Sequence, residues 1–144
     1  VGSGSGPSYV EKVKDRETKR MLCSPDVTLD FILDHAKTAV GSEADTYGGY
    51  GLSKALLTCY TMVLAREHPN ILCSVISPGF IKTKMTEGFN ASKTPEEGTV
   101  AIMHCLFDEL DGNGGYYGSD AVRSPLHYMR NPGEPAYEGK NPFD

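Results

Sequence analysis

Several features of common protein classes are missing from this sequence. Its 144 residues carry a net charge of −5 and a pI of about 5.3, without a basic run, which argues against a nucleic-acid partner. No apolar stretch approaches the ~20 residues that a membrane-spanning helix needs, and no signal peptide is recognisable. These absences favour a cytoplasmic protein of ordinary globular composition that binds neither nucleic acid nor membrane.

Paired cysteines and clustered histidines are missing as well. None of the four cysteines forms a Cys-x-x-Cys pair, so all four are interpreted as buried, reduced thiols. The histidines show no metal-ligand spacing with one another or with cysteine, and no metal is expected. A serine hydrolase is disfavoured because no Gly-x-Ser-x-Gly precedes a helix. The cysteines are Cys23, Cys59, Cys73 and Cys105, and the histidines are His35, His68, His104 and His127.

Helix signals fill the first part of the chain. Residues 1–7 are rich in glycine and serine, and they read either as a flexible linker or as the end of a strand that enters a glycine-rich turn. Ser8-Tyr9-Val10-Glu11 has the spacing of a capping box and predicts a helix that runs to about Leu22. Ser24-Pro25-Asp26 predicts the start of another helix, whose apolar residues recur at helical spacing.

A long helix and a buried strand are expected in the middle of the chain. The polar loop 41–49 leads into an amphipathic helix that begins at Tyr50 and stops before Pro69. The apolar run 71–76 is rich in β-branched residues and predicts a strand buried on both faces, as in a parallel sheet. Pro78-Gly79 then opens a loop at the carboxyl end of this strand, where open α/β sheets bind their ligands.

The last part of the chain begins with the polar segment 82–93, in which Met85 and Phe89 are the expected apolar anchors. Thr94-Pro95-Glu96-Glu97 then predicts a helix to about Leu110, because it combines a cap residue, an early proline and a glutamate three residues after the cap. The remaining elements are a turn at 111–115, a short strand at 116–119 and an irregular tail at about 123–144.

This set of expected elements contains too few strands for a complete sheet. A two-stranded sheet cannot bury enough surface to be stable alone, and parallel strands need neighbours on both sides. We therefore interpret residues 1–144 as a single domain of the α/β class. It would be the C-terminal portion of a doubly wound, parallel-sheet (Rossmann-type) domain, with the N-terminal cofactor half absent from this chain.

Tyr50 and Lys54 are the first candidates for catalysis. They lie four residues apart at the start of the expected helix, so both side chains project from one face. A nearby positive charge favours tyrosinate, so Lys54 would make the phenol a better proton donor to a carbonyl oxygen that receives hydride. The pair alone is not specific, because a tyrosine and a lysine at this spacing also occur on solvated helix faces.

The order of three motifs is more specific than any one of them. Ser3-x-x-Gly6 is followed by Tyr50-x-x-x-Lys54, and Pro78-Gly79-x-x-x-Thr83 follows the expected strand. In this order the chain resembles the short-chain dehydrogenase/reductase family, over essentially its whole length but only in the family's C-terminal half. It is most similar to the monomeric carbonyl reductases, because a helical insertion at about 8–40 separates the serine from the tyrosine. In that subfamily the insertion covers the dimerisation face, which implies a monomer.

The resemblance implies NADP(H)-dependent reduction of an aldehyde, ketone or quinone, with NADP(H) preferred over NAD(H). Tyr50 would protonate the carbonyl oxygen, Lys54 would bind the nicotinamide ribose, and Ser3 would orient the carbonyl, with Ser5 as the competing serine. Residues 85–93 would form the substrate lid. The implied catalytic residues are Ser3, Tyr50 and Lys54, and the implied cofactor-binding residues are Tyr50, Lys54, Pro78, Gly79, Ile81 and Thr83.

The sequence also departs from the family pattern. It lacks the glycine-rich cofactor loop, the Asn-Ala-Gly stretch and the residues that choose between the phosphorylated and the unphosphorylated cofactor. The chain by itself is therefore not expected to hold the adenosine half of a dinucleotide and could be inactive alone. The alternative interpretation is a non-catalytic, reductase-like fragment that acts as a binding or interaction module.

Overall fold

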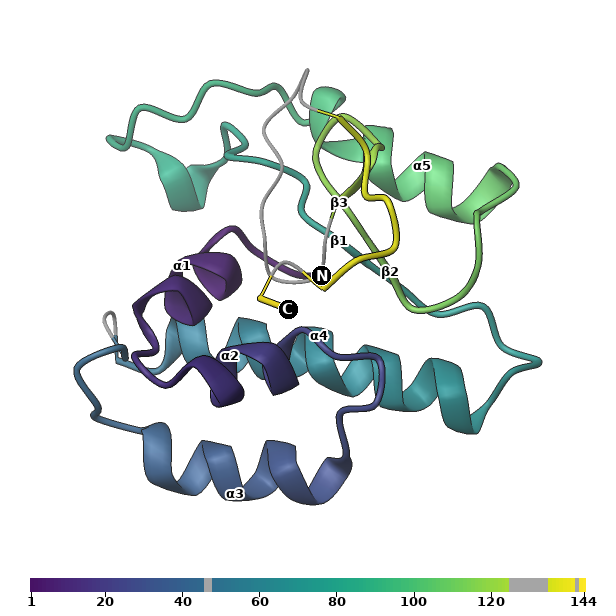
Figure 1. Cartoon of the computed structure of the whole chain (residues 1–144). Coiled ribbons are helices and arrows are strands. Elements are labelled where there is room, and N and C mark those ends of the chain that lie inside the picture. The colour runs from purple at the N-terminus through teal and green to yellow at the C-terminus, as the bar shows by residue number, and fades with distance from the viewer. Residues whose placement is uncertain (46–47, 125–134, 142) are drawn as a thin grey trace.

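The fold is organised around one long helix that lies between two groups of elements. The computed structural model describes residues 1–45, 48–124, 135–141 and 143–144 (Figure 1). Helix α4 (Tyr50–Glu67) packs against the N-terminal helices on one side and against the sheet on the other. The N-terminal helices are α1 (Ser5–Lys12), α2 (Arg16–Leu22) and α3 (Leu29–Ala39), and α5 (Val100–Phe107) packs on strand β1.

The sheet is small and mixed. Strand β1 (Ser74–Ile76) pairs in parallel with β2 (Gly115–Tyr117), which pairs antiparallel with β3 (Arg123–Ser124). Both predicted strands are therefore present, but the third is an addition, because the sequence analysis assigned residues from 123 onward to an irregular tail. Much of that tail, 125–134 and 142, with its His127 and three of its prolines, lies outside the described residues.

The first residues of the chain lie against the sheet. The backbone N–H of Gly2 donates a hydrogen bond of 2.7 Å to the carbonyl oxygen of Ile76. A Cβ atom at Gly2 would lie 2.8 Å from Val75 Cγ1 and 3.3 Å from the Tyr116 ring, so the contact requires a glycine. This packing agrees with the prediction of a chain that leaves a sheet and enters a turn.

The predicted helix from 8 to 22 is in fact two helices. Helix α1 begins at Ser5, before the expected capping box, and its N-cap residue is Gly4, which has no side chain to cap it. The chain is extended at Val13, and Asp15 then caps α2 by accepting a hydrogen bond of 2.7 Å from the backbone N–H of Thr18. A carboxylate cap of this kind starts a new helix, so the aspartate overrides the helical pattern that suggested a single element.

The next two predicted helix starts have different outcomes. The prediction at Ser24 is wrong, because Ser24 Oγ accepts from the Asp26 N–H in a turn, and α3 begins after Thr28, which caps Phe31 N–H. The capping box at 94–97 is confirmed, since Thr94 and Glu97 each accept a hydrogen bond from the other's backbone N–H. A 3-10 turn, η2 (Glu97–Thr99), leads into α5, which ends at Phe107 rather than near Leu110.

A turn side chain connects the segment after α4 to the starts of β1 and β2. Asn113 Oδ1 accepts hydrogen bonds from the backbone N–H of Cys73 and of Gly114, and Nδ2 donates 2.9 Å to the carbonyl oxygen of Ile71. The N–H of Gly114 lies 2.9 Å from the carbonyl oxygen of Cys73 as well. The 111–115 segment is thus a turn, as predicted, and its asparagine aligns β1 with β2.

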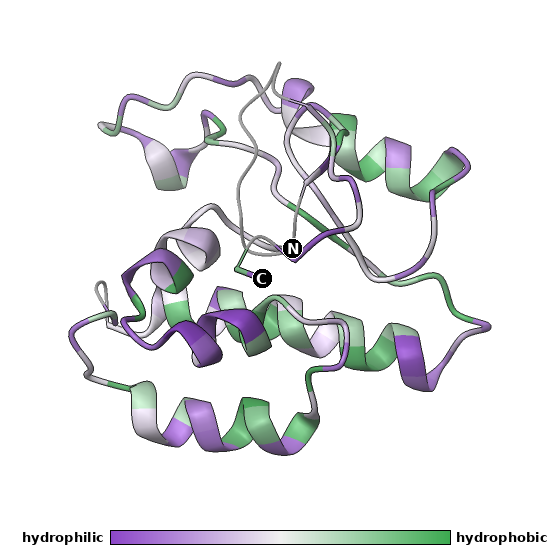
Figure 2. Ribbon diagram, in the orientation of Figure 1, coloured by the Kyte–Doolittle hydropathy of each residue, from purple (hydrophilic) through white to green (hydrophobic). Residues whose placement is uncertain are grey.

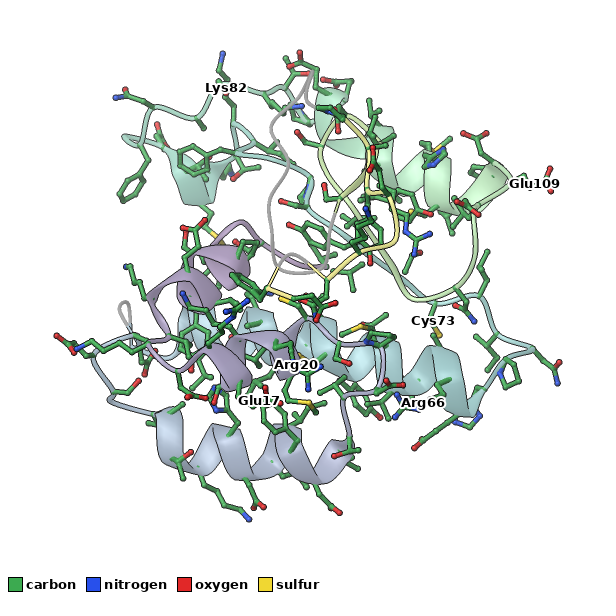
Figure 3. All side chains as sticks on the ribbon, viewed as in Figure 1. Glu17, Arg20, Arg66, Cys73, Lys82 and Glu109 are labelled. Carbon is green, nitrogen blue, oxygen red and sulfur yellow. The ribbon has the colours of Figure 1, made fainter. Side chains whose placement is uncertain are left out.

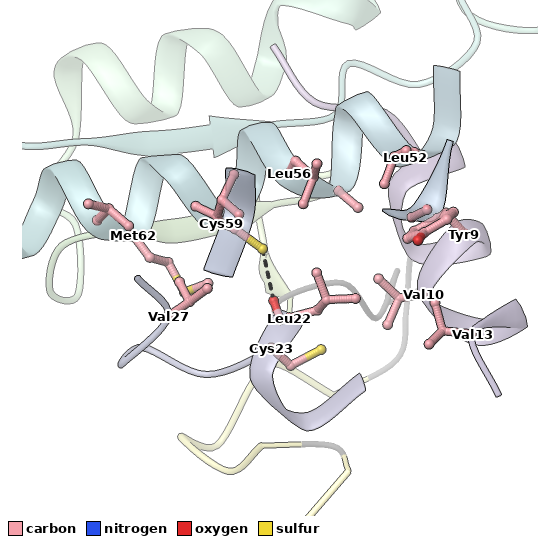
Figure 4. Packing of buried hydrophobic residues seen from close by; sticks show 14 residues of the cluster. Tyr9, Val10, Val13, Leu22, Cys23, Val27, Leu52, Leu56, Cys59 and Met62 are labelled. Atoms are coloured by element: carbon pink, nitrogen blue, oxygen red, sulfur yellow. Dashed lines mark hydrogen bonds between the residues drawn. The ribbon is translucent and has the colours of Figure 1, made fainter. Parts of the chain in front are cut away.

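The main core lies between α4 and the N-terminal helices. Leu22, Val27 and Cys59 are fully buried there, and Cys59 Sγ donates a hydrogen bond of 3.2 Å to the carbonyl oxygen of Leu22 (Figure 4). Burial raises the pKa of the Cys23 thiol to about 12, which keeps it protonated and inert. Only Cys23 and Cys59 are fully buried, whereas Cys73 and Cys105 are half-buried; all four are free thiols.

A second, smaller apolar cluster joins the sheet to α5. Ile76 and Tyr117 pack there against Ala101. The ribbon coloured by hydropathy shows that α5 also carries apolar residues on its outer side (Figure 2), where Leu106 and Phe107 are exposed. Among the described residues, no helix is both long enough and apolar enough to cross a membrane.

Helices α1 and α4 touch at their backbones because both contribute glycine. A Cβ atom at Gly6 would lie 3.2 Å from Ala55 N, and one at Gly51 would lie 2.8 Å from the carbonyl oxygen of Ser5 and 3.2 Å from Tyr9 Cβ. A side chain would clash at Gly51 and would be crowded at Gly6, so the starts of the two helices are in direct contact. The serines at the start of α1 are thereby fixed next to Tyr50.

We predict that Gly51→Ala destabilises the protein although alanine is the better helix former. Its methyl group would clash with backbone atoms of α1, and overpacking of this kind costs about 1–3 kcal/mol. Urea unfolding followed by circular dichroism measures the change. Ser53→Ala, an exposed position on the same helix, is the matched control and should shift stability by less than about 0.5 kcal/mol. An unchanged unfolding midpoint in Gly51→Ala would contradict the close contact.

Candidate active site

The residues that the sequence analysis assigned to a site surround one cavity. This cavity has a volume of about 790 Å³ and lies between the start of α1, the start of α4 and the carboxyl end of β1. Three chain segments that are far apart in the sequence therefore meet at one place. Its walls include Ser3, Ser5, Tyr50, Lys54, Pro78, Gly79, Ile81 and Thr83.

Ser3 is held by backbone contacts at the entrance to α1. Its hydroxyl oxygen accepts a hydrogen bond of 3.2 Å from the N–H of Ser5, and its carbonyl oxygen accepts one of 3.0 Å from the N–H of Gly6. A serine oxygen that accepts in this way can still donate its own proton. Ser3 therefore places a hydroxyl group that can donate at the cavity wall. Ser5, the competing serine, is the first residue of α1 and lines the same cavity.

Tyr50 and Lys54 face the cavity from the first two turns of α4. The ammonium of Lys54 lies 5.5 Å from the centroid of the Tyr50 ring, which is a cation–π distance. It also donates a hydrogen bond of 3.2 Å to the carbonyl oxygen of Val1. Half of the Tyr50 surface is exposed, so the phenol is accessible to a ligand while the lysine is tied to the chain opposite.

The carboxyl end of β1 forms the opposite wall. Ser77 is buried, and its N–H donates a hydrogen bond of 2.9 Å to the carbonyl oxygen of Tyr117, which extends the pairing of β1 with β2 by one residue. Gly79 has φ = +86°, a conformation that side chains disfavour, and a Cβ atom there would lie 2.7 Å from Lys93 Cδ. Pro78 and Gly79 line this wall, and the side chains of Lys93 and Ser119 cover the position that a Cβ atom of Gly79 would take.

The segment after Gly79 only partly matches the predicted lid. Thr83 caps a short 3-10 turn, η1 (Lys84–Thr86), through a reciprocal pair with Thr86. Met85 lines the cavity but is 89% exposed, and Phe89 is 66% exposed. The prediction that these two side chains anchor the segment is therefore wrong, since neither is buried. The segment is attached instead by backbone hydrogen bonds from Lys82 and Lys93 and by Ile81, which packs on Gly98.

Two residues near the site were missed by the sequence analysis. Tyr9 is almost fully buried and forms part of the cavity wall next to Gly51. Asp45 accepts hydrogen bonds from the backbone N–H of Gly41 (3.0 Å) and of Gly49 (2.8 Å). It thereby joins the two ends of the loop that precedes Tyr50. An aspartate within a glycine-rich loop is a known signal for such turns, and that signal was present in the sequence.

Metal chemistry finds no support in the described part of the chain. The residues at 1–45, 48–124, 135–141 and 143–144 contain no group of three or more His, Cys, Asp or Glu side chains placed to hold an ion. His104, the histidine paired with Asp108 at 2.8 Å, lies on α5, and it packs edge-on against Tyr117.

Comparison with curated proteins identifies relatives. (+)-Neomenthol dehydrogenase of Capsicum annuum is 26% identical over 110 residues, which make up 75% of this chain and 35% of that protein. Salutaridine reductase of Papaver somniferum is 35% identical over 68 residues, 47% of this chain and 22% of that protein. Short-chain dehydrogenase/reductase 1 of Saponaria officinalis is 34% identical over 68 residues, again 47% and 22%. The chain is a relative of the short-chain dehydrogenases/reductases.

The relationship to short-chain dehydrogenases/reductases that the motifs predicted is thus confirmed. The matches span about a third or less of the length of these relatives. No family model matches it. The small sheet with helices on both faces is compatible with part of the Rossmann-like domain that the sequence analysis expected.

We predict that Asp45→Asn destabilises the loop before Tyr50. Asparagine keeps one acceptor oxygen, but its NH₂ group would face a backbone N–H that loses its partner, which costs about 1–3 kcal/mol. Amide hydrogen exchange at Gly41 and Gly49 measures the local effect, and we expect faster exchange at one or both. Glu109→Gln, an exposed change in the loop after α5 (Figure 3), removes a carboxylate elsewhere and should leave both amides unaltered. Unchanged exchange in Asp45→Asn would show that the carboxylate does not hold this loop.

Proposed function

We propose that this chain carries the carbonyl-reducing site of an NADP(H)-dependent oxidoreductase of the carbonyl reductase type. The observation that carries the proposal is that Ser3, Tyr50 and Lys54 surround one cavity at the carboxyl end of β1. A hydroxyl, a phenol and an ammonium at one cavity can bind a carbonyl oxygen and deliver a proton to it. The relatives with names of dehydrogenases and reductases support the same class of reaction.

In this proposal Tyr50 is the proton donor. Its ring lies on the accessible side of the cavity and within the field of the Lys54 ammonium. A phenol on the open side of the cavity can donate its proton to a carbonyl oxygen as negative charge develops on that oxygen. In the reverse direction the Tyr50 oxygen would accept the proton of an alcohol.

Ser3 orients the substrate oxygen. Its own oxygen is held by the N–H of Ser5, so its proton is free to point into the cavity towards the carbonyl. A preorganised donor of this kind stabilises the negative charge that develops in the transition state, without reorganising when the charge appears. Ser5 has no comparable backbone contact to its hydroxyl among those of the described residues, which favours Ser3.

The walls of the cavity fit the nicotinamide end of a dinucleotide. Gly2, Gly4 and Gly79 line the cavity, and its volume of about 790 Å³ is sufficient for a ring and its ribose. Lys54 would hold the ribose hydroxyls, while Pro78, Gly79, Ile81 and Thr83 would lie along the ring and its carboxamide. The cofactor, when bound, supplies the hydride. We propose NADP(H) over NAD(H) because the motif order is most similar to carbonyl reductases.

The substrate would be an aldehyde, ketone or quinone. Phe80, Met85 and Tyr9 add apolar surface to the cavity, which suits a carbonyl compound with an apolar body. We also propose that the protein is a monomer, because α2 and α3 cover one face of α4. The competing role, a binding module without catalysis, predicts cofactor or ligand binding without turnover.

We predict that Tyr50→Phe abolishes carbonyl reduction and leaves cofactor binding intact. Phenylalanine keeps the ring against Lys54 but has no proton to give, and loss of a general acid reduces the rate by about 10²–10⁴-fold. The assay follows NADPH oxidation with an aldehyde, a ketone and a quinone, using the natural protein that contains this chain. Tyr60→Phe, an exposed tyrosine on the same helix, is the matched control. Near-normal turnover in Tyr50→Phe would refute the proton-donor role.

Lys54→Met separates binding from chemistry. Methionine has a similar length but carries no charge, so both the ribose contact and the support of Tyr50 are lost. We expect weaker NADPH binding, measured by quenching of cofactor fluorescence, together with slower turnover. Lys82→Met removes an exposed lysine beyond the cavity (Figure 3) and should change neither quantity. If Lys54→Met binds NADPH as tightly as the unmodified protein, the ribose contact is wrong.

A further inference from the structure

Tyr9 is a wall of two neighbouring cavities. On one side it lines the candidate active site with Ser3 and Tyr50. On the other side it lines a second cavity of about 360 Å³, which lies between α1, the start of α2 and the end of α3. Only 3% of its surface is exposed, so its ring fills the space between the site and the inserted helices.

The hydroxyl of Tyr9 is bound by a histidine on α3. Tyr9 Oη and His35 Nε2 are 2.7 Å apart. The His35 ring is stacked on Phe31, with ring centroids 5.7 Å apart and planes at 3°, and it meets the Tyr9 ring edge-on at 6.0 Å. Three rings from two helices thus fix the direction of one hydrogen bond, because neither partner can rotate without losing an aromatic contact.

The backbone of Tyr9 is equally confined on the side of the site. Its Cβ atom lies 3.2 Å from where a Cβ atom of Gly51 would be, and the carbonyl oxygen of Ser5 is closer still. Helix α1 is short, running from Ser5 to Lys12, and Tyr9 lies one helical turn after Ser5, so a displacement of Tyr9 is transmitted to Ser5. Ser3 lies two residues before Ser5, and its hydroxyl oxygen accepts the hydrogen bond of the Ser5 N–H.

We propose that Tyr9 is a positioning residue for the candidate active site, which through its hydrogen bond to His35 lets the inserted helix α3 hold Ser3 in place beside Tyr50. The inserted helices thereby act on the site rather than only covering α4. The importance of Ser3 for catalysis rests on the proposed function. The mechanical link from His35 to Ser3 does not, because it consists of contacts within this chain.

The charge state of the pair follows from burial. Burial lowers the pKa of His35, and burial together with the nearby Asp45 carboxylate raises the pKa of Tyr9 to about 12. Both groups are therefore neutral at neutral pH, with Tyr9 donating to a bare Nε2 or accepting from it. The charged groups around the second cavity are Lys12 and Lys14 from the α1 side, Asp15 at the start of α2, and Glu43 after α3; Asp34 and Lys37 lie on α3 itself.

These neighbouring charges are largely paired with one another. Lys14 forms an ion pair with Glu43, Lys37 forms one of 3.0 Å with Asp34, and Asp15 accepts the Thr18 N–H. None of them accounts for the lowered pKa of His35, whose cause is burial. Because the folded pKa lies below the unfolded one, the unfolded state binds more protons, so the stability from neutral His35 is complete above about pH 6.5 and is lost as the pH falls below it.

A titration of the two ends of this link tests the proposal. The nuclear magnetic resonance signals of the His35 ring and of the Ser5 backbone amide are followed in residues 1–144 from about pH 8 to about pH 5. The Ser5 N–H reports on Ser3 because it donates to the Ser3 hydroxyl oxygen. We expect both signals to titrate with one common midpoint below about 6.5. A role of Tyr9 in stability alone would leave the Ser5 amide unmoved while His35 titrates.

Variants test whether the titration of the Ser5 amide depends on the hydrogen bond between Tyr9 and His35. In Tyr9→Phe the ring remains but the hydroxyl is lost, and we expect His35 to titrate while the Ser5 amide no longer follows. In His35→Gln a side-chain amide can still bond Tyr9 but does not titrate, so the shift of Ser5 should disappear even if Tyr9→Phe fails to fold. Matched controls are Tyr60→Phe and His68→Gln, two exposed positions, which should preserve the common midpoint.

The proposal is overturned if the Ser5 amide signal of the unmodified chain stays constant while His35 titrates. It is also overturned if the Ser5 amide still titrates together with His35 in Tyr9→Phe, or if it still titrates with the same midpoint in His35→Gln. Turnover provides a second readout. Displacing an orienting group by about 1 Å costs up to about 10²-fold, so Tyr9→Phe should lower kcat with little change in KM for NADPH. Coupled titration in a protein without turnover would leave this link intact and reject only the proposed function.

Discussion

The contact between α1 and α4 is the constraint on which the rest of the structure depends. Gly6 and Gly51 allow the two backbones to meet without intervening side chains, because a methyl group at Gly51 would clash with the Ser5 carbonyl oxygen and one at Gly6 would crowd Ala55. Because the contact lies at the first turns of both helices, it places the Ser3 hydroxyl, the Tyr50 phenol and the Lys54 ammonium around one cavity. The core of α2, α3 and α4 behind it keeps this arrangement rigid.

The two walls of the cavity are built on different principles. The helical wall is defined by polar side chains and by glycine-to-backbone packing, whereas the wall at β1 includes the Pro78 ring and the apolar side chains of Phe80 and Ile81. A wall of polar side chains opposite a largely apolar wall is suited to a flat ring with a polar group to one side. This difference between the two walls is consistent with the relatives, whose names describe dehydrogenases and reductases.

Local signals in the sequence predicted local features well. The start of α4 at Tyr50 and the capping box at Thr94 are confirmed, because each depends on residues within one turn of the helix. The break between α1 and α2 was missed, since an aspartate cap at residue 15 competes with a helical pattern that continues through it. The exposure of Met85 was also missed, because it depends on what the segment packs against rather than on its composition.

The candidate site likewise combines features that the sequence predicted with contacts that depend on packing. Its motif residues were predicted from their order along the chain, and the structure brings them to one cavity. The hydrogen bond between Tyr9 and His35, by contrast, joins residues 26 positions apart, and neither residue belongs to a motif. Contacts of this kind arise from the way helices pack, and a single sequence contains no periodic or spacing signal for them.

The turn at Asn113 has a consequence for the chemical lifetime of the protein. An asparagine followed by glycine deamidates when the glycine nitrogen attacks the side-chain carbonyl carbon and closes a succinimide ring. Here the Gly114 N–H is engaged by the Cys73 carbonyl oxygen, and the Asn113 amide is fixed by hydrogen bonds from Cys73 and to Ile71. The folded turn therefore protects the Asn113 side chain from deamidation, and deamidation at this position would require the turn to open first.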